Sequence, residues 1–208
     1  MLIIITLGFT ETFALRSVFK KGLKPMDKII IIQPNKEDER AIKAKNTLID
    51  IVTKVVPNIE IINEKVDTSD FFDSIKKITS VLNNNKERPI YANLSGGMRL
   101  LIVEVLMALT LYPEEAEVEI YSEDGSNTVT FKTDFIKPVQ IDQIDRRILS
   151  NIENSKGSIT SLSNLSNLPK STVWRRLKKL EELNLVKNGN LTPKGYLIIS
   201  SSKSGNGN

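Results

Sequence analysis

The first residues of the chain place the strongest constraint on its fold. Leu2–Leu7 is a continuous apolar run of the kind found in strands that are buried on both faces, as parallel strands are. A second apolar run, Lys28–Gln33, follows a stretch with helical spacing from Phe13 to Lys21. The pattern predicts two parallel strands joined by a helix, which is a βαβ unit.

The alternation of helices and strands continues to about residue 134. The expected elements are a helix at Glu37–Val56, a strand at Ile59–Ile62, a helix from the cap Thr68-Ser69-Asp70 to Asn83, a strand at Pro89–Leu94, a helix at Leu100–Leu111, and a hairpin of Glu117–Tyr121 and Thr128–Lys132. The helix Leu100–Leu111 is nearly all apolar and is expected to be buried on more than one side. The predicted fold is a Rossmann-like, doubly wound α/β domain with a mainly parallel sheet and a closing hairpin.

A second domain follows a short linker. The domains are predicted at 1–134 and 141–208, with 135–140, which include Pro138, between them. In the second domain a short helix, a tight turn and a basic helix at Pro169–Leu183 have the pattern of a helix-turn-helix. A hairpin around Asn188-Gly189-Asn190 supplies the wing. The tail Ser200–Asn208, all Ser, Lys, Gly and Asn, is expected to be frayed.

The turn Asn93-Leu94-Ser95-Gly96-Gly97-Met98-Arg99 lies between a predicted strand and a predicted helix. Gly96 and Gly97 lack a Cβ atom and let the backbone take positive φ and approach a ligand, and Ser95 is the expected N-cap. Arg99 adds fork-shaped donors that suit a phosphate, as do the free N–H groups at a helix start. The alternative is a plain tight connection with Arg99 on a solvated face.

Gly8-Phe9-Thr10 forms a similar turn after the first strand, and ligands of open α/β sheets bind at this edge of the sheet. The dinucleotide fingerprint and the Walker sequence are both missing. An NAD or ATP enzyme of the usual kind is therefore disfavoured.

Charge is divided unevenly along the chain. Residues 1–134 carry 17 basic and 20 acidic side chains, net −3, and residues 135–208 carry 12 basic and 5 acidic, net +7, which together give the +4 of the whole chain. A basic C-terminal part points to an anionic polymer as its partner.

Composition excludes several classes of chemistry. The chain has no cysteine and no histidine, so thiolate nucleophiles, imidazole bases and zinc sites built on those ligands are absent. No metal site and no cofactor is expected. Since no stretch reaches the length of a membrane span or has the pattern of a signal peptide, we expect no membrane partner and a cytoplasmic location.

The helix Pro169–Leu183 is the predicted recognition helix for double-stranded DNA, although a short basic helix can also be a merely solvated face. Trp174 is expected to pack against a neighbouring helix, with a sugar contact as the alternative. The predicted DNA contacts are the polar and basic side chains of this helix and of the wing, namely Lys170, Ser171, Thr172, Arg175, Arg176, Lys178, Lys179 and Lys187.

With these two turns and a winged helix, the chain resembles the CRISPR-associated transcription regulators that carry a CARF sensor domain. The Asn-Leu-Ser-Gly-Gly-x-Arg sequence is the most specific part of the resemblance. It implies a homodimer whose two copies of both turns line a pocket on the dyad for a cyclic oligoadenylate, commonly cyclic tetra-adenylate. The residues that would contact this effector are Gly8, Phe9, Thr10, Ser95, Gly96, Gly97 and Arg99.

The resemblance leaves two functions open. The first is a ligand-responsive regulator of CRISPR or cas promoters that binds a palindromic site and has no catalytic residues. The alternative is a metal-independent ring nuclease, since some members of the family cleave the ring with Ser or Thr and a Lys near these turns. No lysine stands in the motif here, where the cation is Arg99.

Overall fold

The chain folds into two compact units. The computed structural model describes residues 1–36 and 38–203. One unit comprises Met1–Lys137 and the other begins at Pro138. The first unit has a hydrophobic core on each face of its sheet, and the second unit has one core.

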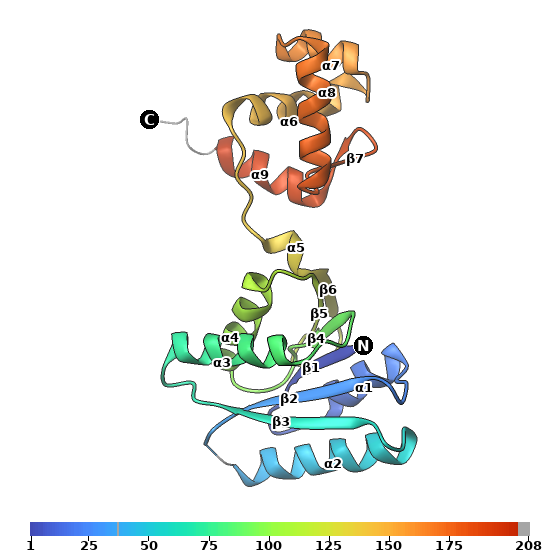
Figure 1. Ribbon diagram of the computed structural model, residues 1–208, viewed down its shortest axis with the longest axis vertical. Coiled ribbons are helices and arrows are strands. Elements are labelled where there is room, and N and C mark those ends of the chain that lie inside the picture. Colours follow the sequence, from blue (N-terminus) through green and yellow to red (C-terminus); the bar gives the residue numbers. More distant parts are fainter. Residues whose placement is uncertain (37, 204–208) are drawn as a thin grey trace. The chain divides into compact units, whose positions relative to one another are not determined.

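The first unit is built on a six-stranded sheet in the order β3-β2-β1-β4-β5-β6 (Figure 1). The parallel strands are β1 (Leu2–Thr6), β2 (Lys28–Pro34), β3 (Glu60–Val66), β4 (Ile90–Asn93) and β5 (Ala116–Tyr121), and β6 (Thr128–Lys132) runs antiparallel to β5. This is the order of a doubly wound sheet, in which the direction of winding reverses between β1 and β4. The predicted fold class is confirmed.

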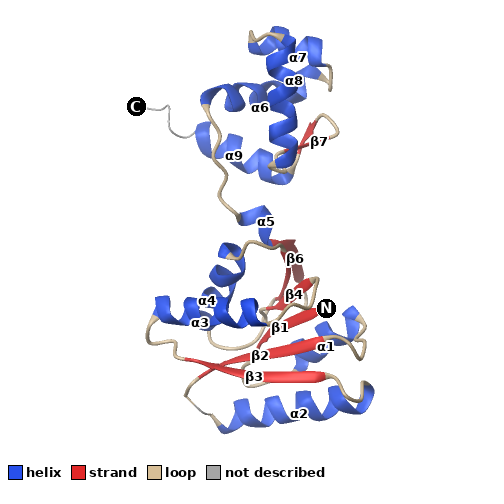
Figure 2. Cartoon of the chain, in the orientation of Figure 1, coloured by secondary structure: helices blue, strands red, loops and turns tan. Residues whose placement is uncertain are grey.

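Helices cover both faces of the sheet (Figure 2). The helices α1 (Thr12–Lys21) and α2 (Glu39–Val55) pack on one face, and α3 (Phe71–Asn84) and α4 (Arg99–Leu111) pack on the other. Ile3 and Ile5 belong to the core under α1 and α2, whereas Leu2 and Ile4 belong to the core under α3 and α4. Because both faces of β1 are covered, every one of its side chains is buried and the strand is apolar almost throughout.

A buried polar cluster ties α1 to the sheet. Ser17 Oγ lies 2.6 Å from the hydroxyl of Tyr91 and donates to Glu119 Oε2 at 2.8 Å. Lys20 Nζ donates to the other carboxylate oxygen of Glu119 at 2.5 Å. Burial disfavours the charged carboxylate, but the hydrogen bonds from Lys20, Tyr91 and Ser17 outweigh that effect and lower the pKa of Glu119. The cluster holds α1 against β4 and β5.

α4 is buried on only one side. Leu101, Val105, Ala108 and Leu109 are buried in the core. The opposite side is an exposed apolar stripe, which consists of Leu100, Val103, Met107 and Leu111. The expected burial on more than one side is therefore wrong for the single chain.

Two other elements of this unit differ from expectation. β3 continues to Val66 because it pairs with β2 along the whole strand, and its polar second half hid this extension in the sequence. Thr133–Ile136 forms a helical turn, α5, which includes residues 135 and 136 of the predicted linker. Its Thr133 side chain is buried and accepts a hydrogen bond from the N–H of Ala116 at 3.0 Å, which attaches α5 to β5.

The second unit is a winged helix-turn-helix. Its elements are α6 (Gln143–Ser155), α7 (Ile159–Ser166), α8 (Lys170–Glu182), the hairpin of β7 (Val186–Lys187) and β8 (Asn190–Leu191), and α9 (Pro193–Lys203). Asn188 and Gly189 both have positive φ in the hairpin turn, as an Asn-Gly turn requires. The predicted frayed tail is wrong for residues 200–203, which belong to α9, and residues 204–208 lie outside the described part of the chain.

Candidate functional site

The two predicted ligand turns touch each other through their backbones. They leave the same edge of the sheet because β1 and β4 are parallel neighbours, with Ile5 opposite Asn93. A Cβ atom on Gly8 would lie 2.6 Å from the N atom of Gly97, and one on Gly96 would lie 2.8 Å from the carbonyl oxygen of Thr6. Gly97 alone of these three glycines has a positive φ, of +91°. Close packing between the turns therefore requires glycine at Gly8 and Gly96.

A cavity of about 880 Å³ opens beside this contact. Its walls come from the carboxyl ends of β1, β2, β3 and β4 and from the start of α2. Six of the seven predicted ligand residues line it, namely Gly8, Phe9, Thr10, Ser95, Gly96 and Gly97. The fold thus gathers both turns around one space.

Arg99 is the seventh predicted ligand residue, and it does not line this cavity. Its side chain is 96% exposed in the first turn of α4, where Nη2 lies 3.7 Å from Oε1 of the equally exposed Glu123. Such an exposed ion pair contributes little to stability, so an anion can compete with Glu123 for Arg99.

Ser95 has a different role from the one expected. The N-cap of α4 is Met98, which makes no side-chain capping bond, so the expectation that Ser95 caps the helix is wrong. Ser95 Oγ instead accepts a hydrogen bond from the N–H of Tyr121 on β5 at 2.9 Å. The first N–H groups of α4 have no capping side chain, and they lie at the end of a helix where anions are favoured.

The strand ends of β2 and β3 complete the cavity and were missed in the sequence. The further lining residues are Leu7, Phe13, Gln33, Pro34, Asn35, Lys36, Asp38, Ala41, Ile42, Lys65, Asp67, Thr68, Ser69, Met98 and Leu100. These residues could have been found from the polar residues that directly follow β2 and β3. They lie at the same carboxyl edge of the sheet as the glycine turns. The β3 end was hidden because the extension of that strand to Val66 was not predicted.

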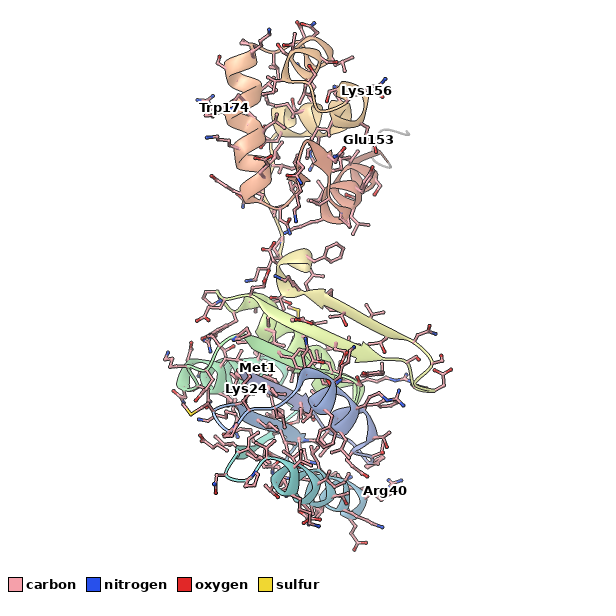
Figure 3. The ribbon with its side chains drawn as sticks, turned by 90° about the vertical axis from the view of Figure 1, so that its right-hand side faces the viewer. Met1, Lys24, Arg40, Glu153, Lys156 and Trp174 are labelled. Atoms are coloured by element: carbon pink, nitrogen blue, oxygen red, sulfur yellow. The ribbon has the colours of Figure 1, made fainter. Side chains whose placement is uncertain are left out.

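Phe9, in the turn after β1, is stacked with Arg40 of α2. The Arg40 guanidinium carbon lies 3.8 Å from the centroid of the Phe9 ring (Figure 3 labels Arg40). Arg40 Nε and Nη2 each donate to the Asp38 carboxylate at 3.2 Å. The Arg40 hydrogen bonds lower the pKa of Asp38, so this carboxylate stays charged and holds the guanidinium over the ring.

The two sides of the cavity differ in their polar groups. The β2 and β3 side carries charges of both signs, the carboxylates of Asp38 and Asp67 and the lysines Lys36 and Lys65. Hydrogen bonds from the hydroxyl of Ser69 at 2.7 Å and from its N–H at 3.0 Å lower the pKa of Asp67 and keep it ionised. The β1 and β4 side offers hydroxyls and backbone N–H groups instead. The glycine turns can therefore donate hydrogen bonds to an anionic group of a ligand.

The predicted recognition helix, α8, presents one exposed face. Ser171, Trp174, Arg175 and Lys178 are all exposed and recur at the spacing of one helix side. Lys170 at the start of the helix and Lys187 on the wing are also exposed, and Thr172 is half-buried. Most of the predicted DNA contacts therefore lie on accessible surface.

Arg176 and Lys179 face α6 instead. Arg176 is 21% exposed, and its Nη1 donates to Asp142 at 2.5 Å and to the fully buried Asp145 at 3.0 Å. Lys179 Nζ donates to the other oxygen of Asp145 at 2.6 Å. Asp142 and Asp145 also form the capping box of α6. These two cations hold α8 to the start of α6. Their contact with DNA stays a prediction, and it would have to replace their bonds to Asp142 and Asp145.

The described residues contain neither a helix that could span a membrane nor a cluster of metal ligands. Between residues 1 and 203, Glu37 apart, no helix is long and apolar enough to cross a membrane. In the same part of the chain no three acidic side chains are grouped so that they could hold a metal ion.

Comparison with known proteins gives a family match for each unit. The Csa3 CRISPR-associated Rossmann-like domain matches residues 1–132. The winged helix-turn-helix DNA-binding domain matches residues 141–187. Csa3 of Saccharolobus solfataricus, a CRISPR locus-related candidate DNA-binding protein, is 26% identical over 198 residues, which are 92% of this chain and 79% of that protein.

Two nucleotide complexes are among the solved structures that align with the chain. Csm6 of Enterococcus italicus, bound to cyclic hexa-2′-fluoro-hexa-dAMP, has a TM-score of 0.49 at 11% identity. Can2 of Sulfobacillus thermosulfidooxidans, in complex with cyclic tetra-adenylate, has a TM-score of 0.47 at 12% identity. The alignments cover 87% and 96% of this chain but 54% and 63% of those structures, so the chain spans about half to two thirds of their length.

The contact between the turns predicts a steric cost for any side chain at Gly8. We expect Gly8→Ala to lower the free energy of unfolding by ~1–3 kcal/mol, because overpacking against backbone atoms cannot be relieved by a rotamer change. The matched control is Gly22→Ala, since a Cβ there meets nothing within 4 Å and only the positive φ of +70° is penalised. Urea unfolding followed by circular dichroism measures both. Equal stability of Gly8→Ala and the parent would contradict the described contact.

Proposed function

Because the chain belongs to the family of the Csa3 CRISPR-associated Rossmann-like domain, we propose that it is a DNA-binding regulator of CRISPR loci that responds to a cyclic oligoadenylate. Residues 1–134 are the sensor domain, residues 135–140 the linker and residues 141–208 the DNA-binding domain. The observation that carries the proposal is the pair of touching glycine turns beside one cavity, in a chain that continues into a winged helix-turn-helix.

The effector binds with its phosphates at the glycine turns. Ser95 Oγ accepts from Tyr121, which leaves the Ser95 hydroxyl proton to donate to a phosphate oxygen. Thr10 and the uncapped start of α4 add further donors. Phe9, with Arg40 on its ring, offers an aromatic surface on which an adenine can stack. Cyclic tetra-adenylate is the ring that we propose as effector.

A ring with two-fold symmetry requires two copies of this site, so the regulator acts as a homodimer. The exposed apolar stripe of α4 is the proposed contact, because it recurs at helical spacing and nothing in the described chain covers it. Arg99 begins the same helix, outside its own cavity. Pairing of the two α4 helices would bring both Arg99 side chains toward a ligand on the dyad.

The DNA site is a palindromic promoter element with half-sites spaced by whole turns of about 10 base pairs. Ser171, Arg175 and Lys178 on the exposed face of α8 enter the major groove or its rim. Lys170 and Lys187 contact phosphates, and Thr172 lies at the edge of the helix face.

The β5–β6 hairpin is the proposed link between the two sites. Tyr121 ends β5, donates its N–H to Ser95 and stacks on Phe13, with ring centroids 5.4 Å apart. Phe13 lines the cavity, and β6 continues through α5 toward Pro138. A ligand that moves Ser95 or Phe13 would therefore shift the strand that leads into the DNA-binding domain.

Cleavage of the ring is a second candidate function, which one observation favours. Lys36 and Lys65 line the cavity together with the hydroxyls of Thr10 and Ser95, so the fold brings lysines near the motif that contains none. A hydroxyl and a lysine can position a ribose 2′-hydroxyl and stabilise a phosphate without a metal. Turnover of labelled ring at enzyme concentrations far below substrate distinguishes a nuclease from a sensor.

Binding of effector and of DNA should be coupled. We expect cyclic tetra-adenylate to bind the protein and to change its promoter affinity by a factor that corresponds to ~1–3 kcal/mol, and promoter DNA to change ring affinity by the same factor. Arg99→Glu should abolish the response and leave DNA affinity without ring unchanged, because Arg99 lies in the sensor domain. Calorimetric titration of ring with and without saturating promoter DNA is the measurement. Equal ring affinities in the parent would show that the domains are uncoupled.

The apolar stripe should govern the oligomeric state. Replacing Val103 and Met107 together by glutamate places two charges in the proposed contact, so the variant should sediment as a monomer at concentrations where the parent is a dimer. Met26→Glu is the control, since Met26 is an exposed apolar side chain on another surface. A parent that sediments as a monomer, or a charged variant that stays dimeric, would refute this interface.

Arg175 and Arg176 should have separable effects. Arg175→Ala is expected to weaken promoter binding by ~1–3 kcal/mol and to leave stability unchanged, since Arg175 is exposed. Arg176→Ala should lower the free energy of unfolding by about 2 kcal/mol, below the ~3–5 kcal/mol typical of a buried charge that loses its partner, because Lys179 still bonds Asp145. Filter binding at fixed salt and thermal unfolding decide, and identical profiles for the two variants would be incompatible with this division.

A further inference from the structure

Trp174 lies on the exposed face of α8 and is not packed against a neighbouring helix. Its side chain is 50% exposed, and Figure 3 shows it on the side of α8 that faces away from the other helices of this unit. The expectation that it packs into the fold is therefore wrong. The indole is half exposed in the middle of a basic helix face, where a ligand can reach it.

Lys178 orients the ring. Its Nζ lies 4.0 Å from the centroid of the Trp174 ring, one helical turn further along α8. This cation–π contact reduces the rotational freedom of the indole and places a positive charge beside it. Ring and charge thus form one surface, apolar in the middle and basic at the edge.

Trp174 also forms a wall of a surface depression of about 450 Å³. The other walls are Ser171, Thr172 and Arg175. Three chemical features meet there: the aromatic ring, the hydroxyl groups of Ser171 and Thr172 with the threonine methyl group, and the donors of a guanidinium. The depression suits an apolar group that projects from a polar, partly negative surface.

The major groove presents one such group, the C5-methyl of thymine. We propose that the Trp174 depression binds the methyl group of one thymine in each half-site, and that Trp174 is thereby a specificity-determining residue of the DNA-binding domain. This inference rests on the DNA-binding function proposed above. A contact of the indole with a sugar would add affinity without distinguishing bases.

The test removes single methyl groups from the DNA. The full-length parent selects a duplex from a random pool, and each thymine of that duplex is then replaced in turn by deoxyuridine. We expect replacement at one position per half-site to weaken parent binding about fourfold, the value of one buried methyl group. Trp174→Ala should bind thymine and deoxyuridine equally at that position, and Trp174→Phe should retain the preference. Since Trp174 is the only tryptophan of the chain, its fluorescence should also change on addition of the duplex.

Lys187→Gln is the matched control, because it removes an exposed cation of the wing rather than of the indole surface and should weaken all duplexes equally while the thymine preference persists. The inference is overturned if no deoxyuridine position affects the parent. It is equally overturned if Trp174→Ala keeps the full preference or weakens every duplex by one common factor, as the loss of a sugar contact would. Failure of the parent to enrich any duplex would instead refute DNA binding itself, and the inference with it.

Discussion

The backbone contact between two turns is the constraint on which the first unit depends. β1 and β4 are parallel neighbours, and the helices that follow them, α1 and α4, lie on opposite faces of the sheet. The two turns therefore cross in close contact at the strand ends. Gly8 and Gly96 allow that crossing, since a Cβ on either would lie within 3 Å of a backbone atom. The contact fixes one wall of the cavity, and the ends of β2 and β3 provide the opposite wall.

A single buried carboxylate organises the other unit. Asp145 completes the capping box of α6 and accepts bonds from two cations of α8. Its burial makes a cationic partner necessary, since an unpaired charge in the core is costly. The basic residues of α8 thus divide by their position around the helix: Arg176 and Lys179 hold the fold together, while Arg175 and Lys178 stay accessible for a ligand.

The fold was predictable because its signals are local or periodic. Buried parallel strands are apolar almost throughout, helices repeat with their own period, and Asn188-Gly189 specifies a tight turn. The predictions failed where pairing decided the outcome. The polar end of β3 is a strand because β2 lies beside it, and α5 is ordered by the bond of Thr133 with Ala116. Neither neighbour is visible from the local sequence.

By itself the sequence determined the order of the elements, the two glycine turns and the basic helix, because residue type alone controls backbone freedom, periodicity and charge. Only the tertiary structure decided which of these residues meet. It left Arg99 outside the cavity that the other predicted residues line, joined Ser95 to Tyr121, and turned Arg176 inward while exposing Trp174. These outcomes depend on distances between residues remote in the chain, and such distances are set by how helices pack on a sheet or on one another.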